Sequence, residues 1–416
     1  MTAGMSQQRR RSAPRARLRS LICTLALAGA WSIAVAGTAP VAAAADVQSK
    51  QWYLDAMQAK EMWKTTTGEG IKVAVIDSGV SPSTPSLRGQ VLKGVDATET
   101  DGTTDDYSGH GTTMAELIAG TGKGAGLQGL APGAKIIPVR VANGAFSGKR
   151  KVNAWDEEDA IRAAADSDAR IISMSWSGEY MTAKGKEAVK YAQSKGKLFF
   201  AAAGNNAKEG NKAQYPAAYP EVVGVASADE KGTVAKYSQH GGNVHIASPG
   251  NNIPRWCDKE LQSYCDGDGG TSAATAIASA SAALVWSAHP DWTANQVLRV
   301  LFETAGRGWK TGTLSNYLGH GLIRPGQVIL DGKGNPGAPD IDPLTDEKAS
   351  SPSGSPAPSA SQDSKGEPGS DTVVAGSSRT AGDDSQSGLI LGAAAVAAVL
   401  ALGAGAFVLV RRRRSI

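Results

Sequence analysis

Four short segments of the sequence carry the residue types that hydrolysis of an amide bond by a serine requires. This chemistry needs a nucleophile, a base that takes its proton, a carboxylate that orients the base, and a donor for the oxyanion. The segments are separated by 33, 95 and 67 residues, and their order predicts a single site. They supply, in chain order, Asp77 in Val-Ile-Asp-Ser-Gly, His110 in Ser-Gly-His-Gly-Thr, Asn205 in Ala-Gly-Asn-Asn, and Ser272 in Gly-Thr-Ser-Ala-Ala.

Strand-like and helix-like patterns alternate around these segments. Short apolar runs predict buried strands, and amphipathic patterns predict helices between them. This alternation favours a mostly parallel central sheet flanked by helices, with the site at the carboxyl ends of the strands. The predicted strands are residues 72–76, 134–141, 169–174, 197–202 and 221–226; the predicted helices are 153–165, 181–194 and one that begins with the capping box at 293–296.

The order Asp, His, Ser is the one found in proteases of the subtilisin type. The four segments resemble those of subtilisin-like serine proteases, and the resemblance covers nearly all of residues 46–331. It implies a subtilisin-like three-layer α/β fold and a serine endopeptidase that cleaves protein or peptide substrates through an acyl-enzyme. By the same resemblance, Asp77 orients the base His110, Ser272 is the nucleophile, and Asn205 donates to the oxyanion. The backbone amide of Ser272 would be the second donor, favoured by a helix N-terminus.

Further features bear on substrate binding and on activity. The segment Ser175-Trp176-Ser177-Gly178 resembles the stretch that pairs with an extended peptide, although an ordinary strand end remains the alternative. The sequence departs from the family at Glu116, where glycine is usual, and at Ala276, where proline is usual. Neither position belongs to the triad, so these departures are expected to alter packing, rate or substrate fit. His320 lies in a second Gly-His-Gly, but it follows the serine and lacks the threonine.

Composition excludes several classes of protein. The chain has 416 residues, of which 20% are charged and 50 are glycine without a three-residue period, so neither a coiled coil nor collagen fits. Ten arginines lie in residues 1–45 and 411–414, and without them the net charge changes from +4 to −6. The slightly acidic body gives no reason to expect a nucleic-acid partner.

The two ends of the chain resemble targeting segments. Residues 1–45 combine a basic stretch, an apolar run and an Ala-x-Ala site, which predicts a cleaved signal peptide; an uncleaved anchor is the alternative. Residues 332–387 are rich in Ser, Pro and Gly and predict a disordered linker. Residues 388–410 lack charge and are long enough for a transmembrane helix, with 411–416 as a cytoplasmic basic tail. A buried core helix or a cell-wall sorting signal would explain the apolar segment less well.

Two cysteines, Cys257 and Cys265, remain after the signal peptide. Outside the cytoplasm they can form a disulfide, with free thiols or a metal pair as alternatives. A metal is disfavoured because no further Cys or His pair lies at ligand spacing. No nucleotide motif is present, and the sequence predicts no cofactor.

The order of segments along the whole chain indicates a subfamily. Only 25 residues, 46–70, precede the first predicted strand, which leaves no room for a folding prodomain. A signal peptide, catalytic body, Pro/Ser-rich stalk and C-terminal anchor together resemble the mycosins, membrane-anchored proteases attached to type VII secretion systems. This resemblance implies a single-pass protein of the bacterial cell membrane with an extracytoplasmic catalytic domain and with components of the secretion channel as partners. The alternative is a channel-stabilising scaffold in which catalysis is secondary.

Overall fold

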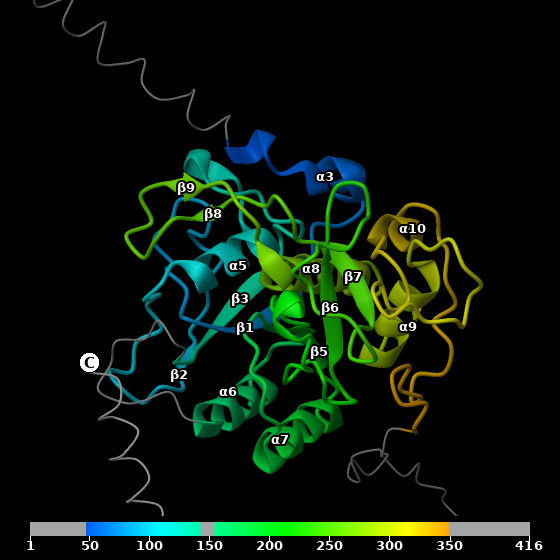
Figure 1. Cartoon of the computed structure of the whole chain (residues 1–416). Coiled ribbons are helices and arrows are strands. Elements are labelled where there is room, and N and C mark those ends of the chain that lie inside the picture. Colours follow the sequence, from blue (N-terminus) through cyan, green and yellow to red (C-terminus); the bar gives the residue numbers. More distant parts are fainter. Residues whose placement is uncertain (1–46, 143–153, 349–416) are drawn as a thin grey trace, which may run out of the picture. The chain divides into compact units, whose positions relative to one another are not determined.

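The computed structural model describes residues 47–142 and 154–348, which belong to one compact unit of the chain. A seven-stranded sheet lies at its centre, and every strand pair in it is parallel (Figure 1). The strand order is β2-β3-β1-β4-β5-β6-β7. The strands are β1 Lys72–Asp77, β2 Val95–Asp96, β3 Lys135–Arg140, β4 Ile171–Met174, β5 Leu198–Ala202, β6 Val223–Ala228 and β7 Ile246–Pro249.

Helices cover both faces of this sheet, so the predicted three-layer α/β fold is confirmed. In Figure 1, α6 and α7 lie together on one side of the sheet, while α5 and α8 lie on the other. The helices are α3 Trp52–Ala56, α4 Ala59–Met62, α5 His110–Ala119, α6 Ala154–Asp166, α7 Ala183–Ser194, α8 Gly270–Ala288, α9 Ala294–Thr304 and α10 Pro325–Ile329, with 3-10 turns η1 Lys123–Ala125 and η2 Ala207–Glu209.

Burial on both faces explains the apolar runs of the strands. Val73 and Val75 of β1 pack into the core that contains α5 and α8, whereas Ala74 and Ile76 pack into the core on the side of α6 and α7. Successive side chains of a strand point to opposite faces, so a strand between two helix layers must be apolar at every position. The predicted capping box at Thr293 also forms, with reciprocal bonds between Thr293 and Gln296.

The strand order places the site. β1 is an interior strand with β3 on one side and β4 on the other, so the chain reverses its direction of progress across the sheet there. Side chains at the carboxyl ends of such strands face an open crevice, because the connections leave in opposite directions. Asp77, the last residue of β1, lies at this point.

The expected boundary between body and linker at residue 331 is wrong. Residues 337–342 bond to the helical layers: the carbonyl of Pro339 accepts from Thr293 Oγ1 at 3.0 Å, and that of Ile341 accepts from Arg299 Nη2 at 2.8 Å. The described part of the body therefore reaches residue 348. This stretch is attached to the body by hydrogen bonds to its backbone, not by a periodic set of apolar side chains. Its composition therefore resembles that of a linker.

The expected signal peptide, transmembrane helix and tail lie outside the described residues. Within residues 47–142 and 154–348, no helix has the length and apolar character needed to cross a membrane.

Candidate active site

Asp77 and His110 meet at the junction of β1 and α5. His110 is the first residue of α5, and its Nδ1 lies 2.8 Å from Oδ1 of Asp77. Asp77 is 3% exposed, whereas the His110 side chain is 39% exposed and so can reach a substrate. Burial lowers the pKa of His110, but the charge and hydrogen bond of Asp77, with a further contribution from Asp106, outweigh burial and hold it above its ordinary value.

Ser272 lies in the first turn of α8 and is 7% exposed. Its hydroxyl donates to the carbonyl oxygen of Ser175 at 2.9 Å, and the Ser175 hydroxyl donates to the carbonyl of Ser272 at 3.2 Å. These reciprocal bonds join the start of α8 to the segment after β4. Within the described part of the chain, no hydrogen bond joins Ser272 to His110, so the hydroxyl is turned toward Ser175 in this structure.

Asn205 follows β5 and contacts the beginning of α8. Its Oδ1 accepts hydrogen bonds from the backbone nitrogen of Thr271 at 2.9 Å and from Thr271 Oγ1 at 3.0 Å. With the oxygen held in this way, the amide Nδ2 is left as a donor beside Gly270, at the start of α8. Gly270 permits the approach: its φ is +72°, and a Cβ there would lie 3.0 Å from Asn205 Nδ2.

The segment predicted to pair with an extended peptide continues from the end of β4. Gly178 exchanges two backbone hydrogen bonds with Tyr215, at 2.9 and 2.7 Å, so this end of the segment is already paired. Trp176 packs partly buried against the core beside α6 and α7. Ser175, at the other end, is buried against Ser272. The structure thus brings Ser175 to the site and ties Gly178 to a neighbouring loop.

Glu116, a departure from the family pattern, is a fully buried carboxyl on α5. Thr84 donates to its Oε1 at 2.8 Å and Tyr264 donates to its Oε2 at 2.7 Å. Burial raises the pKa of Glu116 to about 7, and the hydrogen bonds from Tyr264 and Thr84 only partly oppose this. Ala276, the second departure, is buried within α8.

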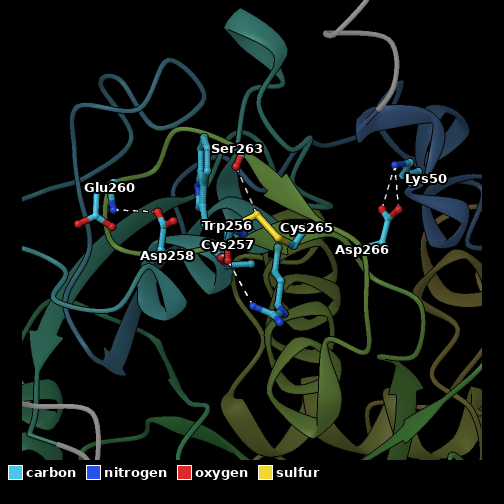
Figure 2. Close-up of a disulfide and its surroundings, with 10 residues drawn as sticks. Lys50, Trp256, Cys257, Asp258, Glu260, Ser263, Cys265 and Asp266 are labelled. Carbon is cyan, nitrogen blue, oxygen red and sulfur yellow. Dashed lines mark hydrogen bonds and ion pairs between the residues drawn. A yellow bond between two sulfur atoms is a disulfide. The ribbon is translucent and has the colours of Figure 1, made fainter.

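A disulfide hairpin packs against the start of α5. Its strands, β8 Arg255–Trp256 and β9 Tyr264–Cys265, are antiparallel, and a disulfide joins Cys257 to Cys265 (Figure 2). Trp256 stacks on Tyr264 with ring centroids 3.8 Å apart. The Trp256 nitrogen donates to Thr113 Oγ1 at 3.1 Å, which attaches the hairpin to the helix of His110.

A cluster of charged residues that sequence reasoning did not single out connects the end of β3 to β2 and to the loop that follows β2. Arg140, at the end of β3, is 3% exposed and forms ion pairs with Asp96 and Asp101. Burial of Asp96 raises its pKa, but the hydrogen bonds of Thr98 and Arg140 outweigh burial and lower it to about 2. The carboxylate is therefore ionised at neutral pH, and the network fixes the loop that leads to His110. Among the described residues, no group of three or more His, Cys, Asp or Glu side chains could hold a metal ion.

Comparison with known proteins identifies the family. The model of the subtilase family matches residues 68–321, more than half of the chain. The chain belongs to the subtilase family. It is a serine endopeptidase of the subtilisin type, as the resemblance of the four segments implied. The matched range contains all four of those segments.

Curated relatives cover different parts of this subtilase. It is 37% identical to thermitase of Thermoactinomyces vulgaris over 205 residues, which are 49% of the chain and 71% of thermitase. It is 31% identical to fervidolysin of Fervidobacterium pennivorans over 347 residues, which are 71% of the chain but only 48% of fervidolysin.

Solved structures with the same fold include mycosins. The MycP3 protease from the type VII (ESX-3) secretion system matches with a TM-score of 0.59 and 29% identity, over 67% of this chain and 88% of MycP3. MycP1 from Mycobacterium smegmatis matches with a TM-score of 0.59 and 26% identity, over 69% of this chain and 86% of MycP1. The subtilase is therefore related to the mycosins.

Proposed function

We propose that Asp77, His110 and Ser272 form the catalytic triad of this subtilase and that Asn205 supplies an oxyanion donor. The observation that carries the proposal is the 2.8 Å contact between His110 Nδ1 and Asp77 Oδ1 at the carboxyl end of β1. A buried carboxylate on Nδ1 fixes the ring so that Nε2 is the free basic nitrogen.

Each step of the reaction then has an assigned group. His110 takes the proton of the Ser272 hydroxyl as Oγ attacks the substrate carbonyl, and later gives it to the leaving amine. The acyl-enzyme is hydrolysed by water through the same two proton transfers. The charge of Asp77 stabilises the imidazolium that forms.

Ser272 must reorient before it attacks. Its hydroxyl donates to the Ser175 carbonyl, and rotation about the Cα–Cβ bond gives up this bond to reach His110. A hydrogen bond of this kind contributes about 1 kcal/mol net, which is small against a catalytic barrier. In this proposal the released Ser175 carbonyl faces the bound peptide, and Ser175–Gly178 forms one wall of the substrate site.

Stabilisation of the oxyanion falls to Asn205 and to the backbone amide of Ser272. Thr271 fixes the Oδ1 of Asn205 through two hydrogen bonds, so its Nδ2 is oriented before the substrate arrives. An oriented donor needs no reorganisation when charge develops, which is why such groups act mainly in the transition state.

The cellular role follows from the ends of the chain and from the relatives. We infer that residues 1–45 direct export and that 388–410 anchor the protease with its catalytic body outside the membrane. The structural similarity to MycP3 and MycP1, both assigned by name to type VII secretion, supports substrates or components of that system as targets.

The decisive test uses a fluorophosphonate probe and the variant Ser272→Ala. The probe should label the wild-type protein at Ser272, and Ser272→Ala should lose both labelling and peptide cleavage while it keeps its circular-dichroism spectrum. Comparing secreted proteins from cells that carry either form would then identify the substrates. Undiminished peptide turnover by purified Ser272→Ala would rule out the triad.

A further inference from the structure

The N-terminus of α5, which carries His110, lacks a cap from its own N-cap residue. That residue is Gly109, which has a φ of +85° and no side chain to accept from the first turn. Two residues outside the helix supply the acceptors instead. Asp106 Oδ2 accepts from the Thr112 nitrogen at 2.8 Å, and Ser78 Oγ accepts from the Gly111 nitrogen at 3.0 Å.

The other carboxylate oxygen of Asp106 is also fully engaged. Its Oδ1 accepts from the backbone nitrogens of Ser108 and Gly109 at 2.9 and 2.8 Å, and from Ser78 Oγ at 2.8 Å. With the bond from Thr112, one half-buried carboxylate receives four hydrogen bonds. A carboxylate that accepts several such bonds is held in one orientation.

These bonds connect Asp77 to His110, the two residues whose relative position the proposed triad requires. Ser78 follows Asp77 directly, and its hydroxyl lies 3.2 Å from Asp77 Oδ1 as well as 2.8 Å from Asp106 Oδ1. Ser108 Oγ donates to Ser78 Oγ at 2.8 Å and accepts from the His110 nitrogen at 3.1 Å. The network therefore runs without a gap from Asp77 to the backbone of His110.

We propose that Asp106 is a positioning residue for His110: it anchors the start of α5 to the end of β1 and places a second negative charge beside the imidazole. The inference rests on the proposed triad. Asp106 acts through Ser78 and the helix backbone and has no contact with the reacting atoms, so its loss should lower kcat with little change in KM.

Charge distinguishes this role from helix capping alone. The charged groups that act on His110 are Asp77 and Asp106, which favour the imidazolium, and Arg255 of the hairpin, which opposes it. Removing the charge of Asp106 should lower the pKa of His110. Because the base must be neutral to act, the acid limb of the pH profile of kcat/KM would then move to lower pH. Loss of a cap alone would lower stability and leave this limb in place.

The test compares Asp106→Asn with the matched control Asp105→Asn. Asp105 is the preceding residue of the same loop and is exposed, and its carboxylate makes no hydrogen bond to the described part of the chain. Both substitutions remove one negative charge. For Asp106→Asn we expect kcat to fall about tenfold, with KM nearly unchanged and the acid limb at lower pH. Asp105→Asn should match the wild type in all three measurements.

A second variant separates position from charge. Ser78→Ala removes the bridging hydroxyl and leaves the carboxylates of Asp77 and Asp106 in place. It should therefore lower kcat but, unlike Asp106→Asn, should not move the acid limb to lower pH. It changes a small buried side chain and so provides the test if Asp106→Asn fails to fold.

Labelling of the wild type by the fluorophosphonate probe separates the two proposals. If the wild type is not labelled at Ser272, the proposed triad fails. If it is labelled and Asp106→Asn has the kcat and acid limb of the wild type, only the role of Asp106 is overturned. An equal shift of the acid limb in Asp105→Asn would also overturn the role of Asp106, because the shift would then come from the overall charge of the loop.

Discussion

Glu116 should make the stability of the protein depend on pH in a direction opposite to most carboxylates. The side chain is fully buried, and its pKa is about 7 in the folded protein against an ordinary value of 4.5. In the folded protein the carboxyl stays protonated up to about pH 7, whereas in the unfolded chain it ionises from about pH 4.5. Its contribution to stability is therefore fully present below about pH 4.5 and is lost as pH rises through 7. This difference corresponds to about 3 kcal/mol of unfolding free energy.

Glu116→Gln should remove this loss. Glutamine has the same shape, carries no charge, and can accept from one of the hydroxyls of Thr84 and Tyr264 while it donates to the other. We expect the variant and the parent to be nearly equal in stability at pH 4.5. At pH 8 the variant should be more stable by about 3 kcal/mol. The difference between the two proteins isolates Glu116, because every other titrating group is common to both.

Urea unfolding across this pH range measures the effect, with Ser272→Ala as the common background to prevent self-digestion. Glu187→Gln, at an exposed position on α7, provides the matched control because it makes the same chemical change outside the core. Parallel curves for Glu116→Gln and its parent would refute the reasoning, because they would mean that burial does not penalise the ionised carboxyl.

Three further predictions follow from the site and its surroundings. Asn205→Ala should lower kcat by about 10²–10³-fold with KM little changed, measured on a peptide substrate; a normal kcat in the folded variant would assign the oxyanion donor elsewhere. Burial lowers the pKa of both His245 and His320 to about 4, so the contribution of these two histidines to stability should be full above pH 6.5 and be lost as pH falls from 6.5 to 4; thermal unfolding of His245→Asn should show a weaker fall over that range. Replacing Cys257 and Cys265 with serine should cost about 2.5 kcal/mol in urea unfolding, and an unchanged midpoint would contradict this.

Sequence reasoning succeeded where local pattern and tertiary structure agree. The strand at 72–76 was predictable because β1 is buried on both faces and therefore apolar throughout. The strands β2 and β7 were not predicted: β2 has two residues, and β7 is the four-residue stretch Ile-Ala-Ser-Pro, whose length and composition give little strand signal. Short strands such as these depend on pairing with neighbours rather than on their own pattern.

The site shows the same division. Asp77 and His110 could be singled out because their flanking glycines and threonine make recognisable segments. Asp106 could not, because its role depends on Ser78, 28 residues away, and a run such as Asp105-Asp106 is an ordinary feature of exposed loops. Glu116 was noticed only as a departure. Its partner Tyr264 lies 148 residues further along the chain, so the buried bond between them could not be read from the sequence.

Under the proposed triad, the position of α8 in the chain determines when cleavage becomes possible. Its residues from Gly270 to Trp286 are buried, and it packs against β4, β5, β6 and β7, which all precede it in the chain. Any nascent or partly exported chain that ends before α8 lacks the helix that packs against these four strands and also lacks Ser272. Under the proposed triad, the nucleophile is therefore carried by a helix that packs on four strands made before it, and a growing polypeptide that ends before residue 270 has no such activity.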